Sequence, residues 1–275
     1  MLSIIISSYQ PHYYSALQDS IADTCGIPYE IIKIDNPGLM GICEAYNKGA
    51  AKALYNNLLF LHEDVLFETK DWGKRLIAFL AKESVGCVGL AGSSYVPNVP
   101  HKWWKNQGYR FNNVLHIINN KVSRAEQFTE HSQKVYSLDG VFIACRRDVY
   151  NQVQFSKSLS SYHGYDIDFS IRVSETHQNY IISEIELLHF SGGNANKDWF
   201  KEIIKTRNFY KIPKHQKNDK NIELLQYDLF AESVYRYCDT KKEALSLLIK
   251  YFSLKKMGIK NISRCLKFCY YILQK

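Results

Sequence analysis

The chain of 275 residues lacks several features that would assign it to common classes of protein. No apolar run approaches the roughly 20 residues that span a bilayer, so we expect no transmembrane helix. The N-terminus has neither a basic region nor a small-residue cleavage site, and residues 2–8 are interpreted as a strand rather than a signal peptide. The seven cysteines are scattered and form no C-x-x-C pair, which favours a reduced, cytoplasmic setting.

Residues 1–240 also lack an excess of basic side chains, although the net charge of the chain is +8. Nine Lys/Arg and one acid fall within residues 241–275, and the remaining 240 residues hold 26 basic and 26 acidic side chains. Nucleic acid is therefore not an expected partner. The tail mixes its basic residues with apolar ones such as Leu248, Phe252 and Leu266, which predicts an amphipathic helix on an anionic membrane. A helical cap or a dimer contact is the alternative, and the oligomeric state stays open.

Short apolar runs alternate with helical patterns over the first ninety residues. Strands are predicted at 2–8, 29–34, 58–61 and 85–91, and helices at 13–24, 42–55 and 71–82. This order predicts an α/β fold, with a mostly parallel sheet flanked by helices. Later strands are predicted at 137–145 and 180–190, helices at 146–153 and 166–175, and a long loop at 93–113. Because the chain looks helical after about residue 197, we divide it into a domain, 1–196, and a helical extension, 197–275.

Polar residues gather where the predicted strands end. They are Ser7, Ser8 and Tyr9; Asp35 and Asn36; His62, Glu63 and Asp64; Asp139 and Gly140; Asp166 and Asp168; and His189. In open α/β sheets ligands bind beyond the carboxyl ends of the strands. The triplet 62–64 is the most informative, because three donor side chains directly follow a buried apolar strand. Such a cluster indicates a cationic or reactive group at that place.

Seven segments, in this order, resemble the motifs of one enzyme family. They are LSIIISSYQ (2–10), EIIKIDN (30–36), GICEAYNKG (41–49), LFLHEDV (59–65), DGVFIACRR (139–147), YHGYDIDF (162–169) and IELLHFSGG (185–193). Over residues 2–195 the chain is similar to the family 2 glycosyltransferases, which have the Rossmann-like GT-A fold. Within that family it resembles the bacterial glycosyltransferase-like branch, with an H-x-D motif in place of D-x-D.

The resemblance implies a site for Mn²⁺ or Mg²⁺. Glycosyl transfer from a nucleotide sugar releases a diphosphate, and a divalent cation stabilises its growing charge. Asp64 matches the main carboxylate ligand and His189 a second ligand, while His62 stands where an aspartate is usual. Imidazole also binds such metals. The alternatives are an ordinary strand-end turn residue for Asp64 and a satisfied sheet-edge histidine for His189.

The resemblance also implies the remaining site residues. Asp166 matches the general base that takes the acceptor's proton, although Asp166 and Asp168 could instead be acids at a helix N-terminus. Residues expected to bind the nucleotide sugar are Ser7, Ser8, Tyr9, Asp35, Asn36, Lys48, Glu63, Asp139 and Gly140. Residues expected to bind the acceptor are Trp103, Trp104 and Tyr165, the last standing where glutamate is usual. A solvated side chain is the alternative for Lys48 and Glu63, and a buried anchor for the two tryptophans.

These observations predict an inverting, metal-assisted glycosyltransferase of the hexosyltransferase type. Its donor would be a nucleotide-diphosphate sugar and its acceptor a saccharide or a lipid-linked molecule, in bacterial surface polysaccharide or glycolipid synthesis at the inner face of the plasma membrane. A nucleotidyltransferase is disfavoured because residues 7–10 contain no glycine, and a dinucleotide oxidoreductase because no G-x-G-x-x-G follows the first strand. A catalytically silent sugar- or nucleotide-binding scaffold is the alternative, supported by His62 and Tyr165.

Overall fold

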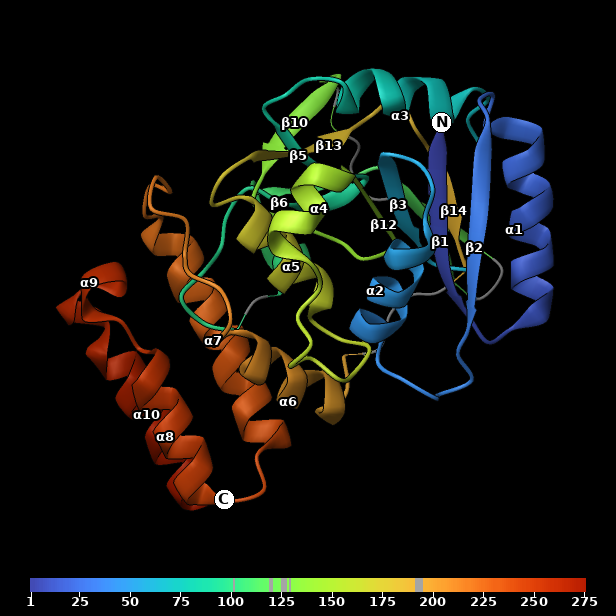
Figure 1. Ribbon diagram of the computed structural model, residues 1–275. Coiled ribbons are helices and arrows are strands. Elements are labelled where there is room, and N and C mark those ends of the chain that lie inside the picture. The colour runs from blue at the N-terminus through green and yellow to red at the C-terminus, as the bar shows by residue number, and fades with distance from the viewer. Residues whose placement is uncertain (101, 119–120, 125–127, 129, 191–194) are drawn as a thin grey trace.

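A seven-stranded sheet forms the centre of the structure, a computed structural model that describes residues 1–100, 102–118, 121–124, 128, 130–190 and 195–275 (Figure 1). In spatial order its strands are β10 (Ser132–Val135), β13 (Gln178–Ile182), β5 (Val85–Gly89), β12 (Phe142–Arg146), β3 (Asn57–Leu61), β1 (Leu2–Ser8) and β2 (Tyr29–Asp35). Only β12 and β10 run antiparallel to their neighbours in this sheet. The predicted mostly parallel sheet is therefore confirmed.

Helices cover both faces of this sheet. The helices of the domain are α1 (Pro11–Thr24), α2 (Ile42–Lys52), α3 (Trp72–Leu80), α4 (Arg147–Val153) and α5 (Tyr165–Val173). Side chains alternate along β1, as the pleat of a strand requires: Ile4 and Ile6 share a hydrophobic cluster with residues of α1 and α3, whereas Ile5 lies in the cluster that contains residues of α2 and α4. A Cβ on Gly49 of α2 would lie 2.3 Å from Ile5 Cγ2, so this glycine permits the close approach of helix and strand.

Two smaller sheets extend the central one. One has the order β11 (Ser137–Leu138), β6 (Ala91–Ser93), β7 (Arg110–Asn112), and the other β4 (Val65–Phe67), β14 (Leu187–His189), β8 (Val114–Ile118), β9 (Lys121–Arg124). The single strand predicted at 180–190 is therefore wrong. A bend at Ser183 and Glu184 separates β13, in the central sheet, from β14, in the four-stranded sheet. The strand predicted at 137–145 is likewise split, with β11 and β12 in different sheets.

The C-terminal helices form a third group beside the sheet, with α6 next to α5 (Figure 1). They are α6 (Lys197–Thr206), α7 (Lys220–Tyr237), α8 (Lys241–Tyr251), α9 (Leu254–Met257) and α10 (Ile262–Gln274). The described residues also form two short 3₁₀ helices, η1 (Trp103–Lys105) in the long loop and η2 (Ile259–Asn261) before α10. Tyr227, Phe230 and Leu248 lie in a hydrophobic cluster of their own, which Val99 joins. No helix within the described ranges is long and apolar enough to cross a membrane. The division of the chain at residue 196 stays a prediction.

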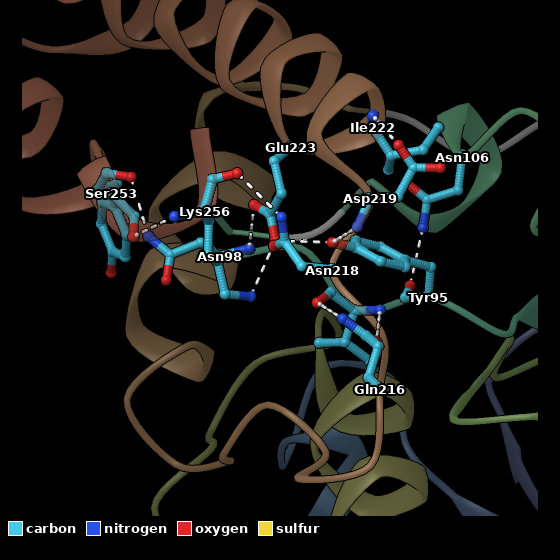
Figure 2. Close-up of polar contacts among 12 residues, drawn as sticks. Tyr95, Asn98, Asn106, Gln216, Asn218, Asp219, Ile222, Glu223, Ser253 and Lys256 are labelled. Atoms are coloured by element: carbon cyan, nitrogen blue, oxygen red, sulfur yellow. Dashed lines mark hydrogen bonds and ion pairs between the residues drawn. The ribbon is translucent and has the colours of Figure 1, made fainter. Parts of the chain in front are cut away.

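A buried carboxylate ties the long loop to these helices (Figure 2). Glu223 of α7 is fully buried, and its oxygens accept hydrogen bonds from the Tyr95 hydroxyl at 2.9 Å and the Asn98 backbone N–H at 3.0 Å. The Lys256 ammonium of α9 lies 2.8 Å from Glu223 Oε1. Because a buried charge is unfavourable without such partners, Glu223 fixes three segments relative to one another.

Removing the cation from this cluster should destabilise the fold. We expect Lys256→Met to lower the free energy of unfolding by about 2 kcal/mol, because Glu223 then keeps its buried charge with only neutral donors. Urea unfolding followed by circular dichroism measures the change. Lys255→Met, at the exposed neighbouring position, is the matched control. Equal stability of the two variants would contradict the role given to Glu223.

Candidate active site

The four-stranded sheet brings together side chains that are far apart in sequence. Asp64 directly precedes β4 and His189 ends β14, and the antiparallel pairing places His189 opposite Val65. Phe190 N–H donates to the carbonyl of Asp64 at 3.0 Å. Asp64 Oδ1 consequently lies 3.4 Å from His189 Nε2 and 3.9 Å from His62 Nδ1. One donor atom from each of these three side chains lies within 4.8 Å of the others, which is the geometry of a candidate metal site.

The donor set of this cluster fits a divalent cation. His189 is 8% exposed, yet neither ring nitrogen has a hydrogen-bond partner in the part of the chain that the structure describes, which is unusual for buried polar atoms. Asp64 Oδ1 lies 3.4 and 3.9 Å from the nearest nitrogens of His189 and His62, close enough for the three side chains to share one cation. Two imidazoles and a carboxylate suit a first-row divalent metal.

The charge states of these residues suit the same use. Burial alone would raise the pKa of Asp64, but contacts with His189 and His62 more than offset it and hold this pKa below its usual value. Burial lowers the pKa of His62, with His189 acting in the same direction and Asp64 against it. Asp64 is therefore ionised at neutral pH and His62 is neutral. A neutral imidazole has one nitrogen lone pair for a metal.

A third histidine, which the sequence reasoning missed, lies beside this cluster. His116 is opposite His189 in the parallel pairing of β8 with β14, and the centroids of the two rings are 5.4 Å apart. The rings of His62 and His189 are 5.7 Å apart. The apolar run VLHII at 114–118 is the signal for this strand, but it lies just beyond the predicted loop and no strand is predicted there.

Asp166 has the environment of a general base. It lies in the first turn of α5, and its Oδ2 accepts a hydrogen bond from the Gly140 N–H at 3.1 Å. Burial raises the pKa of Asp166 to about 7, and the charge of Asp139 acts in the same direction. A base is most effective when its pKa lies near the working pH. Asp139 caps the following turn, since its Oδ1 accepts from the Val141 N–H at 3.0 Å.

Asp168 has different partners and a different role. It is fully buried and contacts the Arg172 guanidinium through both oxygens, at 3.0 and 2.7 Å. Arg172 in turn donates to the carbonyls of Val153 and Gln154, so Asp168 joins α5 to the end of α4. The structure thus gives Asp168 a structural role.

Tyr165 connects the surroundings of Asp166 to the cluster of His62, Asp64 and His189. Its hydroxyl oxygen lies 2.8 Å from His62 Nε2 and donates to the carbonyl of Gly140 at 3.2 Å. A Cβ on Gly140 would lie 2.0 Å from this oxygen, so only glycine leaves room for the phenol. The predicted contact of Tyr165 with the acceptor is not supported, because the side chain is 4% exposed and its hydroxyl is occupied by protein partners.

The ends of β1 and β3 are held together by Glu63. Its carboxylate is 5% exposed and accepts hydrogen bonds from the backbone N–H groups of Tyr9 and Gln10, each at 3.1 Å to Oε1. The alternative of a solvated acid is therefore wrong for Glu63. The Tyr9 side chain is 63% exposed, so its ring is accessible to a ligand.

Buried polar groups continue this edge at the end of β2. The Asn36 amide donates to Ser7 Oγ at 3.1 Å and accepts from the Met40 N–H at 3.0 Å, which orders residues 36–40. The Ser8 hydroxyl is buried and has no hydrogen-bond partner among the described residues. Ser7 and Asn36, both predicted to bind the nucleotide sugar, are thus in contact through their side chains, and the Asn36 N–H donates to the carbonyl of Ser8 at 2.8 Å.

The structure places the other predicted binding residues in ordinary roles. Asp35 is exposed and pairs with Lys33 at 2.6 Å, and Lys48 pairs with Glu44 of the same helix at 2.8 Å, as a solvated lysine would. Trp103 is 7% exposed, and the ring of Trp104 lies 5.5 Å from that of Trp199 in α6. These contacts favour the anchor alternative for both tryptophans. Residues 191–193 of the last motif lie outside the described residues.

Solved glycosyltransferase structures share this fold. TarS residues 1–349 of S. aureus, in complex with UDP, are 14% identical with a TM-score of 0.52, over 86% of this chain and 71% of that one. The mannosyltransferase PcManGT from Pyrobaculum calidifontis, in complex with GDP-Man and Mn²⁺, is 12% identical with a TM-score of 0.57, over 99% and 83%. GalNAc-T7 with UDP, GalNAc and Mn²⁺ is 12% identical with a TM-score of 0.56, over 100% and 56%. The predicted GT-A fold is confirmed.

A sequence match identifies the family. The model described as "Glycosyltransferase like family" matches residues 3–227, which is most of the chain. The protein therefore belongs to this family and is a glycosyltransferase. No curated protein matched the chain in sequence.

The environment of Asp166 predicts a pH-dependent stability. Its folded-state pKa of about 7 lies above the usual 3.8, so the folded state retains a proton that the unfolded chain has lost between these values. The free energy of unfolding therefore falls as pH rises through this window. Asp166→Asn cannot bind this proton. The free energy of unfolding of Asp166→Asn minus that of wild type should therefore be about 2–4 kcal/mol larger at pH 8 than at pH 4.

Urea unfolding at both pH values measures this difference. Asp35→Asn, at an exposed position, is the control and should show the same difference from wild type at both. An Asp166→Asn effect that does not change with pH would contradict the environment described for this carboxyl group.

Proposed function

We propose that this glycosyltransferase moves a sugar from a nucleotide-diphosphate sugar to a saccharide or lipid-linked acceptor, with inversion and with a divalent cation. The observation that carries the proposal is the cluster of His62, Asp64 and His189, joined through Tyr165 and Gly140 to Asp166. UDP, GDP-Man and Mn²⁺ are bound in structures of the same fold, which supports this class of donor and cofactor.

The reaction assigns a task to each of these residues. Asp64, with His189 and His62, would hold a bound Mn²⁺ or Mg²⁺, which stabilises the charge of the departing diphosphate. Asp166 takes the proton of the acceptor hydroxyl as its oxygen bonds to the anomeric carbon. The bond from that carbon to the diphosphate breaks, and the diphosphate leaves with the electron pair.

The surroundings of Asp166 support inversion. Retention by a double displacement needs a carboxylate free to act as a nucleophile. Asp168 is bound to Arg172, and Asp139 caps the turn at Val141. Asp166 is left as the base for a single displacement.

The edge beside this cluster would bind the nucleotide. Tyr9 presents an exposed ring for stacking on the base, and Ser7, Ser8 and Asn36 supply hydroxyl and amide groups at the ends of β1 and β2. Asp35, Lys48, Asp139 and Gly140 remain proposed donor contacts, and Trp103 and Trp104 proposed acceptor contacts. Of these, Gly140 has the strongest support, because its backbone contacts both Asp166 and Tyr165.

Titration with nucleotides tests the donor site. We expect UDP or GDP to bind in Mn²⁺ and at least ten-fold more weakly in EDTA or in Asp64→Asn, because Asp64 supplies the charged metal ligand. Isothermal calorimetry measures the affinities. Asp71→Asn, an exposed aspartate paired with Lys74, is the matched control and should bind like wild type.

The other outcomes are equally informative. Absence of nucleotide binding under every metal condition would overturn the proposal. Binding that ignores both Mn²⁺ and Asp64 would remove the cation from the mechanism. Metal-dependent binding with no turnover of any donor would favour the catalytically silent scaffold.

We also propose that the C-terminal helices lie on an anionic membrane. Apolar side chains on α10 recur every three or four positions and are exposed by 45–62%; they are Ile262, Leu266, Tyr270 and Leu273. Cys265 and Ile272, on another face of the same helix, are buried. Because residues 241–275 carry nine basic side chains and one acid, two copies would repel one another at this surface, whereas anionic lipid would attract it. This supports a lipid-linked acceptor in surface polysaccharide or glycolipid synthesis on the cytoplasmic side of a plasma membrane.

Vesicle sedimentation tests this surface. We expect binding to phosphatidylglycerol vesicles but not to phosphatidylcholine vesicles, and a loss of at least five-fold in Leu266→Glu, because the substitution places an acid in the apolar stripe. Leu54→Glu, at a position that is 77% exposed before β3, should bind like wild type. Equal binding by the two variants would argue for another role of α10.

A further inference from the structure

Two residues that depart from the family motifs are in direct contact. His62 stands where an aspartate is usual and Tyr165 where a glutamate is usual, and His62 Nε2 lies 2.8 Å from the Tyr165 hydroxyl oxygen. One follows β3 and the other begins α5. The rings of Tyr46 and Phe155, at 5.8 and 6.0 Å from that of Tyr165, hold the phenol in the buried core.

The direction of the hydrogen bond between Tyr165 and His62 depends on which partner receives the hydroxyl proton of Tyr165. The Tyr165 oxygen also lies 3.2 Å from the carbonyl oxygen of Gly140, which can only accept a hydrogen bond. The phenol has a single proton, which it can donate to only one of these two partners. If that proton goes to Gly140, His62 Nε2 must carry a proton and donate it to the Tyr165 oxygen. Both contacts are satisfied only in this arrangement.

This arrangement leaves the other nitrogen of His62 free to bind a metal. A neutral imidazole, the form that binds a metal, has one N–H group and one lone pair. With the proton on Nε2, the lone pair lies on Nδ1. Nδ1 is the nitrogen that faces Asp64, 3.9 Å from its Oδ1.

We propose that Tyr165 is a positioning residue that fixes the tautomer and the orientation of His62, so that Nδ1 of His62 binds the divalent cation with Asp64 and His189. The inference rests on the proposed function and deepens it. A site with two imidazoles should prefer Mn²⁺ to Mg²⁺.

Removal of one oxygen tests the proposal. Tyr165→Phe keeps the ring in the core and deletes the acceptor for His62 Nε2–H. We expect the Kd for Mn²⁺, measured by titration of the nucleotide-free protein with Mn²⁺ alone and electron paramagnetic resonance, to rise 10- to 100-fold. Tyr150→Phe is the matched control, because Tyr150 is also 4% exposed and donates its hydroxyl proton to Asn47 at 2.7 Å. Equal Mn²⁺ affinities of wild type and Tyr165→Phe would overturn the proposal.

The tautomer itself gives a second readout that a general loss of stability would not change. In metal-free protein labelled with ¹⁵N-histidine, two-bond correlation spectra should show His62 protonated at Nε2, with its signals assigned from His62→Asn. Tyr165→Phe should produce a mixture of tautomers, and Tyr150→Phe should not. Protonation at Nδ1 in wild type would overturn the inference. Because these spectra need no nucleotide, they remain decisive even if the calorimetry contradicts the proposed donor.

Discussion

The pairing of β14 with β4 is the constraint on which the rest of the site depends. It joins residues more than a hundred positions apart and sets His189 opposite Val65, so that the histidine meets Asp64 across the sheet. A shift of this pairing by one residue would turn His189 to the other face of the sheet. The bend at Ser183 and Glu184 makes the pairing possible, because it releases β14 from the central sheet. Backbone hydrogen bonds therefore determine how His62, Asp64 and His189 are arranged, and these side chains do not have to assemble the cluster themselves.

Buried polar groups of the candidate site lower the stability of the fold, and the surrounding structure offsets this loss. His189 is buried with both ring nitrogens unsatisfied by the described residues, and Asp166 keeps a proton that an exposed aspartate would lose. His189 departs from the rule that buried polar groups are paired, whereas Asp166 is paired with the Gly140 N–H but lies where its charged form is disfavoured. The proposed divalent cation would satisfy His189, and the proposed acceptor hydroxyl would supply a proton to the ionised form of Asp166. The same unfavourable features that reduce stability therefore indicate where the ligands bind.

Local features could be predicted from the sequence, and contacts between distant segments could not. The buried strands follow from apolar runs, and the triplet 62–64 was found because a core strand has little reason to end in three polar side chains. The register between β8 and β14 has no local signal, so His116 was missed and residues 180–190 were predicted as one strand. Burial of Trp103 depends on tertiary packing in the same way. The hydrogen bonds of Glu63 could not be predicted either, because its partners are N–H groups at the end of β1, a different strand.

Gly140 contacts both Asp166 and Tyr165 through its backbone. Its N–H donates to Asp166, the proposed base, and its carbonyl accepts from Tyr165, the proposed support of the metal ligand His62. The positions of Asp166 and Tyr165 are thus linked through the backbone of one residue, which packing against the phenol requires to be glycine. A displacement of this residue would move both groups together, and catalysis depends on their relative position. Besides the donor contact that the resemblance implies, the Asp139-Gly140 motif therefore connects Asp166, the proposed base, with Tyr165 and His62.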